Sequence, residues 1–438
     1  MPNRIIGIWL LAAFAIISVL GVPSPARAEQ MTAVSSEYRD RAADLLEILK
    51  GSQKEESFFA SSFLDAVPLA QFRDLVNQLN TQYGEPLSVS RIIPASNTDG
   101  TVEITYTKAV LAMRMVLDSN APYPVVGLLI TGANMKDDNI GKIADEIAAL
   151  SGLSGFQVAD LSGDKPQTIV ELNSSEQLAI GSTFKIYVLA ELSRSIKAGE
   201  RQWSDVTPLN RKSLPSGVLQ DWPNGTPLTL QTLATMMISI SDNSATDILI
   251  DVVGRDKVDE MMRRTGHTQP DKTAPMLKTL EMFALKMPSN SDLRQRYIKA
   301  SETEQKQLLA DEQARLGIDS VSIANLANEP VHIDTIEWFA SPTDISNLLN
   351  HILKTNDPVV LDIIKVNSII PPGDALRWNY IGGKGGSEPG VISFAFLTKS
   401  KSGKTYAISG SWNNSKAPVD NDKFTLIFNR LPNLIASR

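Results

Sequence analysis

The sequence Gly181-Ser182-Thr183-Phe184-Lys185 is followed at once by an apolar run, residues 186–192. This pattern predicts a helix that starts near Ser182, with Ser182 and Lys185 one turn apart on the same face. A helix N-terminus favours negative charge, and a lysine with a lowered pKa can take the proton of a serine hydroxyl without a histidine. The same pattern is also typical of an N-cap serine followed by a surface lysine. Taken alone, the stretch leaves both interpretations open.

Two further motifs lie downstream. Ser241-Asp242-Asn243 lies between two apolar helical segments, and Lys384-Gly385-Gly386 precedes an apolar strand that begins at Val391. In this order the three motifs resemble the Ser-x-x-Lys, Ser-Asp-Asn and Lys-Thr-Gly set of class A β-lactamases and penicillin-binding proteins. The resemblance covers about residues 149–438. It implies an α/β fold in which both ends of this region supply strands to one antiparallel sheet and helices fill the region between.

The resemblance also implies a role for each motif residue. Ser182 would be the acylated nucleophile, and Lys185 would activate it. Ser241 would relay a proton to the leaving group, with help from Lys384 across the cleft. Such a site would act on the carbonyl group of a small-molecule substrate.

Substrate binding is expected from three further residues, Asn243, Gly386 and Ser387. By the same resemblance, Asn243 would hold the substrate's amide and the Lys185 ammonium. The backbone N–H groups of Ser182 and Ser387 would form an oxyanion hole, in which one donor is typically worth about 3 kcal/mol in the transition state. Asp242 is expected to cap or pack a helix rather than to act in catalysis.

The chain departs from the family pattern at two places. Gly385 replaces a threonine or serine, so one hydroxyl that would bind a substrate carboxylate is missing, and Ser387 can replace it only in part. The deacylating glutamate has no clear counterpart. Glu329 and Glu337 lie in the right region but outside the full motif, where a solvated surface acid is the alternative. The sequence therefore predicts slow turnover of β-lactams and continued hydrolysis of small reactive esters.

The N-terminus has the features of a secretory signal peptide. Arg4 is followed by the apolar run 5–22 and by Ala26-Arg27-Ala28, a short basic region, an apolar core and a small-residue cleavage site. Cleavage after Ala28 would give a periplasmic or secreted protein that meets the membrane only through residues 1–28. An uncleaved membrane anchor is the alternative.

The remaining sequence has two regions that differ in their hydrophobic periodicity. Residues 35–84 carry apolar side chains at helical spacing, and from residue 87 the period changes to two. We therefore expect a small α+β domain over residues 31–134, with an element order similar to the cone-shaped fold of steroid isomerases. A second domain over residues 140–438 carries the three motifs. Within it, the charged segment of about 289–316 is expected to be a helical insertion or a solvated lid.

Composition excludes several functions. The chain of 438 residues has 42 Lys and Arg against 49 Asp and Glu, a net charge of −7, so it lacks the basic footprint of a nucleic-acid-binding protein. It has no cysteine and three histidines, and no two of the histidines have the spacing of a helical metal pair. We expect neither a metal nor a cofactor.

Two functions remain open. The layout resembles a two-domain β-lactamase-like protein of clavulanic acid clusters, and this resemblance implies esterase-type rather than strong β-lactamase chemistry. The leading hypothesis is an exported serine acyl hydrolase that forms an acyl-enzyme with a β-lactam, an ester or a related carbonyl compound. The alternative is a binding protein for a β-lactam or a cell-wall peptide that is acylated but turns over poorly.

Overall fold

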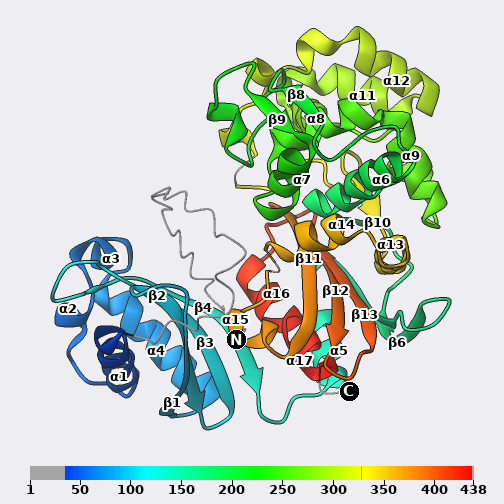
Figure 1. Cartoon of the computed structure of the whole chain (residues 1–438). Helices are drawn as coiled ribbons and strands as arrows, with labels where there is room; N and C mark the ends of the chain where they lie inside the picture. Colours follow the sequence, from blue (N-terminus) through cyan, green and yellow to red (C-terminus); the bar gives the residue numbers. More distant parts are fainter. Residues whose placement is uncertain (1–34, 327, 368, 437–438) are drawn as a thin grey trace. The chain divides into compact units, whose positions relative to one another are not determined.

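The computed structural model describes residues 35–326, 328–367 and 369–436, and these form two compact units (Figure 1). The smaller unit contains residues 35–138 and 371–373, and the larger unit contains the rest. The expected signal peptide, residues 1–28, lies outside the described residues.

The smaller unit consists of helices followed by a sheet, in the order that the sequence predicts. Its helices are α1 (Ser36–Leu49), α2 (Glu55–Phe58), α3 (Ser61–Ala66) and α4 (Leu69–Tyr83). Its strands are β1 (Pro86–Pro94), β2 (Asp99–Tyr106), β3 (Ala109–Leu117) and β4 (Val125–Met135), and they form an antiparallel sheet in sequence order.

The apolar periods of this unit account for its core. In α1, Tyr38, Ala42 and Leu45 recur at helical spacing and are all buried. In β2, the buried Val102, Ile104 and Tyr106 are separated by Glu103 and Thr105, which are partly exposed. Each period therefore places one face of its element against the core. The similarity to steroid isomerases stays a prediction.

The larger unit is built on a five-stranded antiparallel sheet with the order β11-β12-β13-β5-β6. Its strands are β5 (Leu153–Asp160), β6 (Gln167–Leu172), β11 (Trp378–Glu388), β12 (Val391–Ser400) and β13 (Thr405–Asn413). Strand β13 pairs with β5, so the start and the end of this unit meet in one sheet. The expected α/β fold, with helices between the two groups of strands, is confirmed.

Both faces of this sheet are covered by helices. Along β12, Phe394 and Phe396 pack with α5 (Ile140–Ala148), α16 (Asn421–Phe428) and α17 (Arg430–Ile435). The intervening Ala395 and Leu397 belong to a second core on the other face. A strand that is apolar on both sides is typical of a sheet buried between two layers.

The second core is mostly helical. Its helices are α6 (Lys185–Lys197), α7 (Leu230–Ser239), α8 (Asn243–Val253), α9 (Arg255–Arg264), α10 (Thr279–Lys286), α11 (Ser291–Lys299), α12 (Glu302–Asp311), α13 (Pro342–Thr355) and α14 (Pro358–Lys365). A short helix, α15 (Pro372–Ala375), precedes β11, and the small strands β8 (Val206–Pro208) and β9 (Pro227–Thr229) pair with each other.

The charged segment 289–316 is helical, as expected, and forms α11 and α12. Its apolar side chains Leu293, Tyr297 and Leu309 are buried in the same core as α6. This segment is therefore part of the helical layer. Its charged side chains are exposed or partly exposed except for Arg294, which is buried and donates to the Leu285 carbonyl over 2.8 Å.

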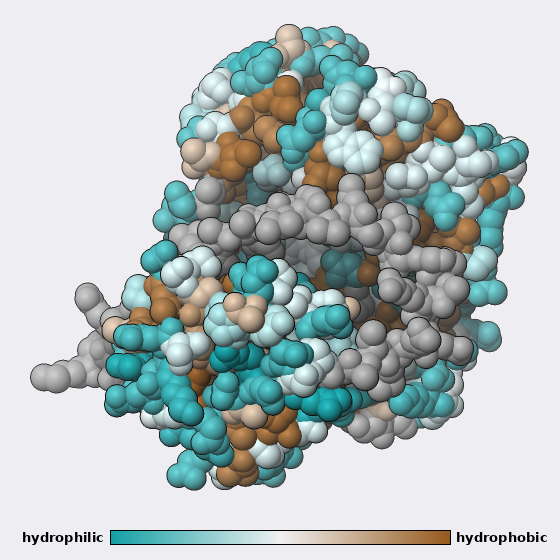
Figure 2. All heavy atoms as spheres, turned by 60° about the vertical axis from the view of Figure 1, so that its left-hand side comes forward, coloured by the Kyte–Doolittle hydropathy of each residue, from teal (hydrophilic) through white to brown (hydrophobic). Residues whose placement is uncertain are grey.

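The surface of the described residues is mainly polar. Figure 2 shows hydrophobic side chains in small groups between hydrophilic ones on the face it presents. Large apolar side chains that are exposed, such as Leu87, Leu129 and Val206, come from different elements. None of the described helices is long and apolar enough to span a bilayer.

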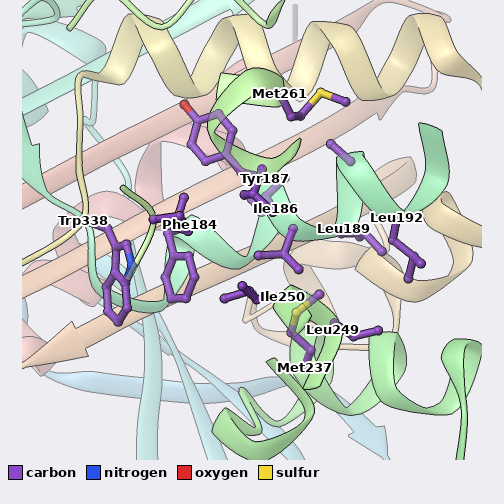
Figure 3. Close-up of a cluster of buried hydrophobic side chains, with 14 of the residues drawn as sticks. Phe184, Ile186, Tyr187, Leu189, Leu192, Met237, Leu249, Ile250, Met261 and Trp338 are labelled. Atoms are coloured by element: carbon purple, nitrogen blue, oxygen red, sulfur yellow. The ribbon is translucent and has the colours of Figure 1, made fainter. Parts of the chain in front are cut away.

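A pair of two-residue strands, not predicted from the sequence, fixes the segment before Ser182. Strand β7 (Leu178–Ala179) pairs with β10 (Phe339–Ala340), and the Ile180 N–H donates to the Trp338 carbonyl over 2.9 Å. The Trp338 ring stacks on Phe184 with 3.8 Å between centroids, and Figure 3 shows the two rings side by side. The stacked rings of Phe184 and Trp338 thus fix the turn that carries Ser182.

We predict that Trp338→Ala lowers the free energy of unfolding by about 3–5 kcal/mol, the usual cost of removing a buried aromatic side chain. Trp338 is 2% exposed, and its Nε1–H donates to the Leu277 carbonyl over 3.0 Å. Urea unfolding followed by circular dichroism measures the loss. The control is Leu153→Ala, which truncates a side chain that is 41% exposed. A loss no larger than that of the control would contradict the assigned packing.

Candidate active site

Ser182 lies in a tight turn at the start of a buried helix. A 3₁₀ turn, Gly181–Phe184, leads directly into α6 at Lys185. Ser182 is partly exposed, whereas Thr183, Phe184 and Lys185 are buried. Within the described residues the Ser182 hydroxyl makes no hydrogen bond. The turn therefore presents one accessible hydroxyl group on an otherwise buried segment.

The Lys185 side chain is completely buried and reaches the Ser241 motif. Its Nζ donates to the Ser241 carbonyl over 2.8 Å, to Ser241 Oγ over 3.1 Å and to Asn243 Oδ1 over 2.7 Å. Burial, followed by the charge of Lys384, holds the pKa of Lys185 well below its usual range, and the charges of Asp247 and Asp242 oppose this. A lowered pKa makes the neutral amine, which can accept a proton, accessible at lower pH.

Lys384 approaches the same hydroxyl from the opposite side. It lies on β11, and its Nζ donates to Ser241 Oγ over 3.1 Å and to the Gly385 carbonyl over 2.5 Å. Burial lowers the pKa of Lys384 to about 7. The Ser241 hydroxyl thus lies between two buried lysine side chains and can pass a proton from one side to the other.

Ser241 and its neighbours are held by a loop that precedes them in the chain. Ser241 has a left-handed backbone, with φ of 58°, and its carbonyl also accepts from Ser216 Oγ over 2.8 Å. Asn243 Nδ2 donates to the Leu214 carbonyl over 2.8 Å, so its Oδ1 faces Lys185. These contacts orient both polar groups of the motif toward the site.

Asp242 caps α8, as expected. Its carboxylate accepts the Ala245 N–H over 2.8 Å at the start of the helix. It also accepts the N–H groups of Val218 and Leu219, over 2.8 and 3.0 Å. Asp242 therefore joins the loop to the helix and takes no direct part in the hydroxyl–lysine arrangement.

Strand β11 passes very close to the Ser182 turn because residue 386 is glycine. A Cβ atom at Gly386 would lie 2.2 Å from the Ile180 carbonyl oxygen and 2.5 Å from the Ser182 nitrogen. On the facing segment, a Cβ atom at Gly181 would lie 3.2 Å from the Ser387 nitrogen. The backbone nitrogens of Ser182 and Ser387 thus lie on two segments in direct contact, as a pair of oxyanion donors requires.

At Gly385 the site has an apolar neighbour in place of the missing hydroxyl. A Cβ atom at Gly385 would lie 3.0 Å from Ile369 Cδ1 and 3.3 Å from Phe394 Cδ1. A threonine would be crowded at this position. The surrounding side chains therefore leave little room for the side chain of a threonine at this position.

The two glutamates considered for deacylation lie in different surroundings. Glu329 is exposed, and Pro330, which follows it, lies against the turn after β11, where a Cβ at Gly390 would be 2.8 Å from Pro330 Cβ. Glu337 is buried, 4% exposed, and burial raises the pKa of Glu337 well above its usual range. A carboxyl group cannot take a proton from water while it holds one, so the raised pKa disfavours Glu337 as the general base.

Sequence reasoning missed the groups that support the motifs. Leu214 and Ser216 have no recognisable pattern. Asp247 is buried one turn after Asn243, and its carboxylate accepts the N–H and hydroxyl groups of Thr279. Its spacing of four residues from Asn243 was the available signal. Among the residues that the structure describes, no group of three or more His, Asp or Glu side chains could hold a metal ion.

One comparison with known proteins agrees with the family that the three motifs resemble. A family model described as the beta-lactamase enzyme family matches residues 140–357. No curated protein matches the chain. Similar solved structures each cover 68% of this chain: a β-lactamase from Sphaerobacter thermophilus (20% identity, 97% of that chain, TM-score 0.47), PBP-A (14%, 94%, 0.47) and a β-lactamase from Francisella tularensis (15%, 97%, 0.48).

We predict that Lys384→Met stabilises the protein more at pH 6 than at pH 9.5. The pKa of Lys384 is about 7 when folded against an ordinary value of 10.5, so the folded chain binds fewer protons between these values and its stability rises with pH across this window. Removing the lysine at pH 6 removes the full cost of the buried charge, about 1–4 kcal/mol. Urea unfolding at both pH values measures the difference. The exposed Lys401→Met serves as the control, and an equal gain at both pH values would contradict the lowered pKa.

We also predict that Gly386→Ala slows chemical labelling of Ser182 by a fluorophosphonate about 100-fold, because the added Cβ forces the strand and the turn apart. Intact-mass spectrometry measures the labelling rate. Gly163→Ala is the matched control, since a Cβ there has no neighbour closer than 3.9 Å. Unchanged labelling of a folded Gly386→Ala protein would show that the close approach has no role in reactivity.

Proposed function

Because residues 140–357 match the model of the beta-lactamase enzyme family, we propose that this chain is an exported serine acyl hydrolase. Ser182 forms an acyl-enzyme with a β-lactam, an ester or a related carbonyl compound. The observation that carries this proposal is the convergence of Lys185 and Lys384 on the Ser241 hydroxyl, 3.1 Å from each Nζ.

Acylation follows from the proton positions in this arrangement. Neutral Lys185 takes the proton of Ser182 while Ser182 Oγ bonds to the carbonyl carbon, and the carbonyl oxygen becomes an oxyanion between the Ser182 and Ser387 N–H groups. When the bond to the leaving group breaks, Lys185 returns the proton through the Ser241 hydroxyl, and Lys384 stabilises that hydroxyl. The lowered pKa of Lys185 supports the first step, because it makes the neutral amine, which can act as a base, accessible at a lower pH than for an ordinary lysine.

Deacylation sets the difference between substrates. Water must attack the acyl carbonyl and lose a proton to a general base. Glu329 is exposed, and burial raises the pKa of Glu337, so neither residue is a clear general base. A bulky penicilloyl group therefore stays on Ser182, whereas a small acyl group leaves room for water beside the carbonyl. We propose hydrolysis of small activated esters with slow release of β-lactams.

Export is part of the proposal because residues 1–28 have the pattern of a signal peptide. The mature protein would begin at Glu29 and act in the periplasm or outside the cell. N-terminal sequencing of the exported protein tests this, and an intact Met1 would refute it.

We predict that Ser182→Ala abolishes hydrolysis of an aryl ester and that Lys185→Ala reduces it by nearly as much. The two side chains act as one unit, so the double variant loses little more than either single variant. Ser241→Ala and Lys384→Ala lose less, about 2–4 kcal/mol in the barrier, the usual contribution of one stabilising interaction. Steady-state and stopped-flow ester hydrolysis measure these effects, with Ser175→Ala, an exposed serine, as the control.

Intact mass after exposure to a penicillin, an aryl ester and a fluorophosphonate separates the hydrolase from the binding protein. A penicilloyl adduct on Ser182 that persists while the ester turns over supports the proposal. An adduct with both substrates and no turnover of either favours the acylated binding protein. Ester hydrolysis that is unchanged in Ser182→Ala would overturn the assignment.

A further inference from the structure

Three ionisable side chains are buried together outside the set of motif residues. Lys286 lies at the end of α10 and is 1% exposed, Glu337 lies just before β10 and is 4% exposed, and Glu388 ends β11 with a side chain that is 10% exposed. Lys286 Nζ binds Glu388 Oε1 directly and lies 3.6 Å from Glu337 Oε1. We name these three residues the carboxyl–lysine cluster.

The hydrogen bonds of Glu337 indicate where a proton is held. Its Oε2 accepts the Trp338 N–H over 2.7 Å, whereas its Oε1 is buried without a hydrogen-bond donor among the described residues. The Glu388 carboxyl approaches the same Lys286 Nζ as Glu337 does, and its proximity raises the pKa of Glu337. Two adjacent carboxylates beside one ammonium leave an excess negative charge in a buried site. A proton shared between the two carboxyl groups removes that charge and satisfies the unpaired oxygen.

The cluster joins the two chain segments that carry the proposed oxyanion donors. Glu388 directly follows Ser387 on β11. On the other side, Glu337 holds the Trp338 N–H, and the Trp338 carbonyl accepts the N–H of Ile180, two residues before Ser182. A shift of either carboxyl group is therefore transmitted to one of the two backbone donors.

Resting on the function proposed above, we propose that Lys286, Glu337 and Glu388 form a positioning cluster whose shared proton and buried ammonium fix the Ser387 end of β11 against the segment that carries Ser182. The three side chains hold the two oxyanion donors at one separation. They do not contact the reacting atoms, so they act through Ser387 and Ser182.

The proposal implies a dependence on pH. Burial and then the charge of Glu388 raise the pKa of Glu337, and Lys286 opposes them. The proton is therefore kept to a higher pH than in an ordinary carboxyl group and is lost as the pH rises through the raised pKa, after which the two carboxylates repel each other. His332 lies near Lys286, and the charges of Arg294 and Asp334 act on the same histidine. Asp271 and Lys272 line a pocket of about 180 Å³ together with Glu337.

The experiment measures fluorophosphonate labelling of Ser182 against pH in the full-length protein. Glu337→Ala should slow labelling about 100-fold at pH 7, because a small displacement of a reacting geometry has effects of this size. Glu337→Gln should restore the rate, since its amide donates the same hydrogen bond to Glu388, and its rate should lack the decline that wild type shows at high pH. Glu176→Gln, an exposed glutamate, is the control.

A double variant tests the shared proton independently. Lys286 needs one negative partner, so Glu388→Gln leaves Glu337 to ionise beside it, whereas Glu337→Gln/Glu388→Gln leaves the ammonium unpaired. The double variant should lose far more labelling than the product of the two single effects. Equal labelling by Glu337→Ala and wild type, or a decline at high pH that persists in Glu337→Gln, would overturn the proposal. If the double variant does not fold, the labelling rates of the single variants Glu337→Ala and Glu337→Gln still test the proposal.

Failure of the proposed function gives a different result. If Ser182 of the wild-type protein is never labelled, the hydrolase assignment fails while the cluster can still be tested by unfolding. Because the folded pKa of Glu337 is raised, the stability of wild type falls relative to Glu337→Gln as the pH rises from the ordinary value of 4.5 toward the raised value. Parallel stability curves for the two proteins would show that no proton is held at Glu337.

Discussion

The burial of two lysine side chains beside one serine hydroxyl is the constraint on which the larger unit depends. Removing two like charges from water is costly, and the cost is tolerable only where each ammonium finds fixed acceptors. For Lys185 the fold supplies the Ser241 carbonyl and Asn243 from a distant part of the chain. Lys384 donates to the distant Ser241 Oγ and to the carbonyl of its neighbour Gly385. The same cost keeps both pKa values low, so the feature that strains stability is also the one that makes a lysine useful as a base.

The support for these groups is arranged in layers around the Ser182 turn. Phe184 and Trp338 stack beneath it, β11 passes beside it at a distance that only glycine allows, and Ser393 Oγ donates to the Ile180 carbonyl over 2.6 Å from β12. A helix, a strand and a loop thus meet at one serine. Rigid placement of this kind is what oxyanion stabilisation needs, because its donors must already be in position when charge develops.

Much of this could be predicted from the sequence, for a physical reason. The elements around Ser182, Ser241 and Lys384 are fixed by local periodicity and by caps such as Asp242, and local patterns are visible in a sequence. The residues that support the motif residues could not be predicted in this way. Lys286, Glu337 and Glu388 are far apart in the chain and follow no period, and the pairing of β7 with β10 rests on two residues in each strand. Contacts of this type arise only when the whole chain is folded.

The contact between α5 and α17 has a consequence for how the chain of the larger unit could be reconnected. These two helices lie at opposite ends of the unit's sequence, yet they share one core, and Arg430 forms an ion pair of 2.7 Å with Glu146 across this contact. A domain whose first and last helices touch is close to a closed ring, and such domains usually tolerate being joined there and opened elsewhere. The exposed turn between β12 and β13 offers a place to open it, far along the chain from Ser182 and Ser241. A circularly permuted protein opened at that turn would keep the packing of the unit and change only the order of its elements along the chain. Its stability would therefore show how much the fold depends on chain order.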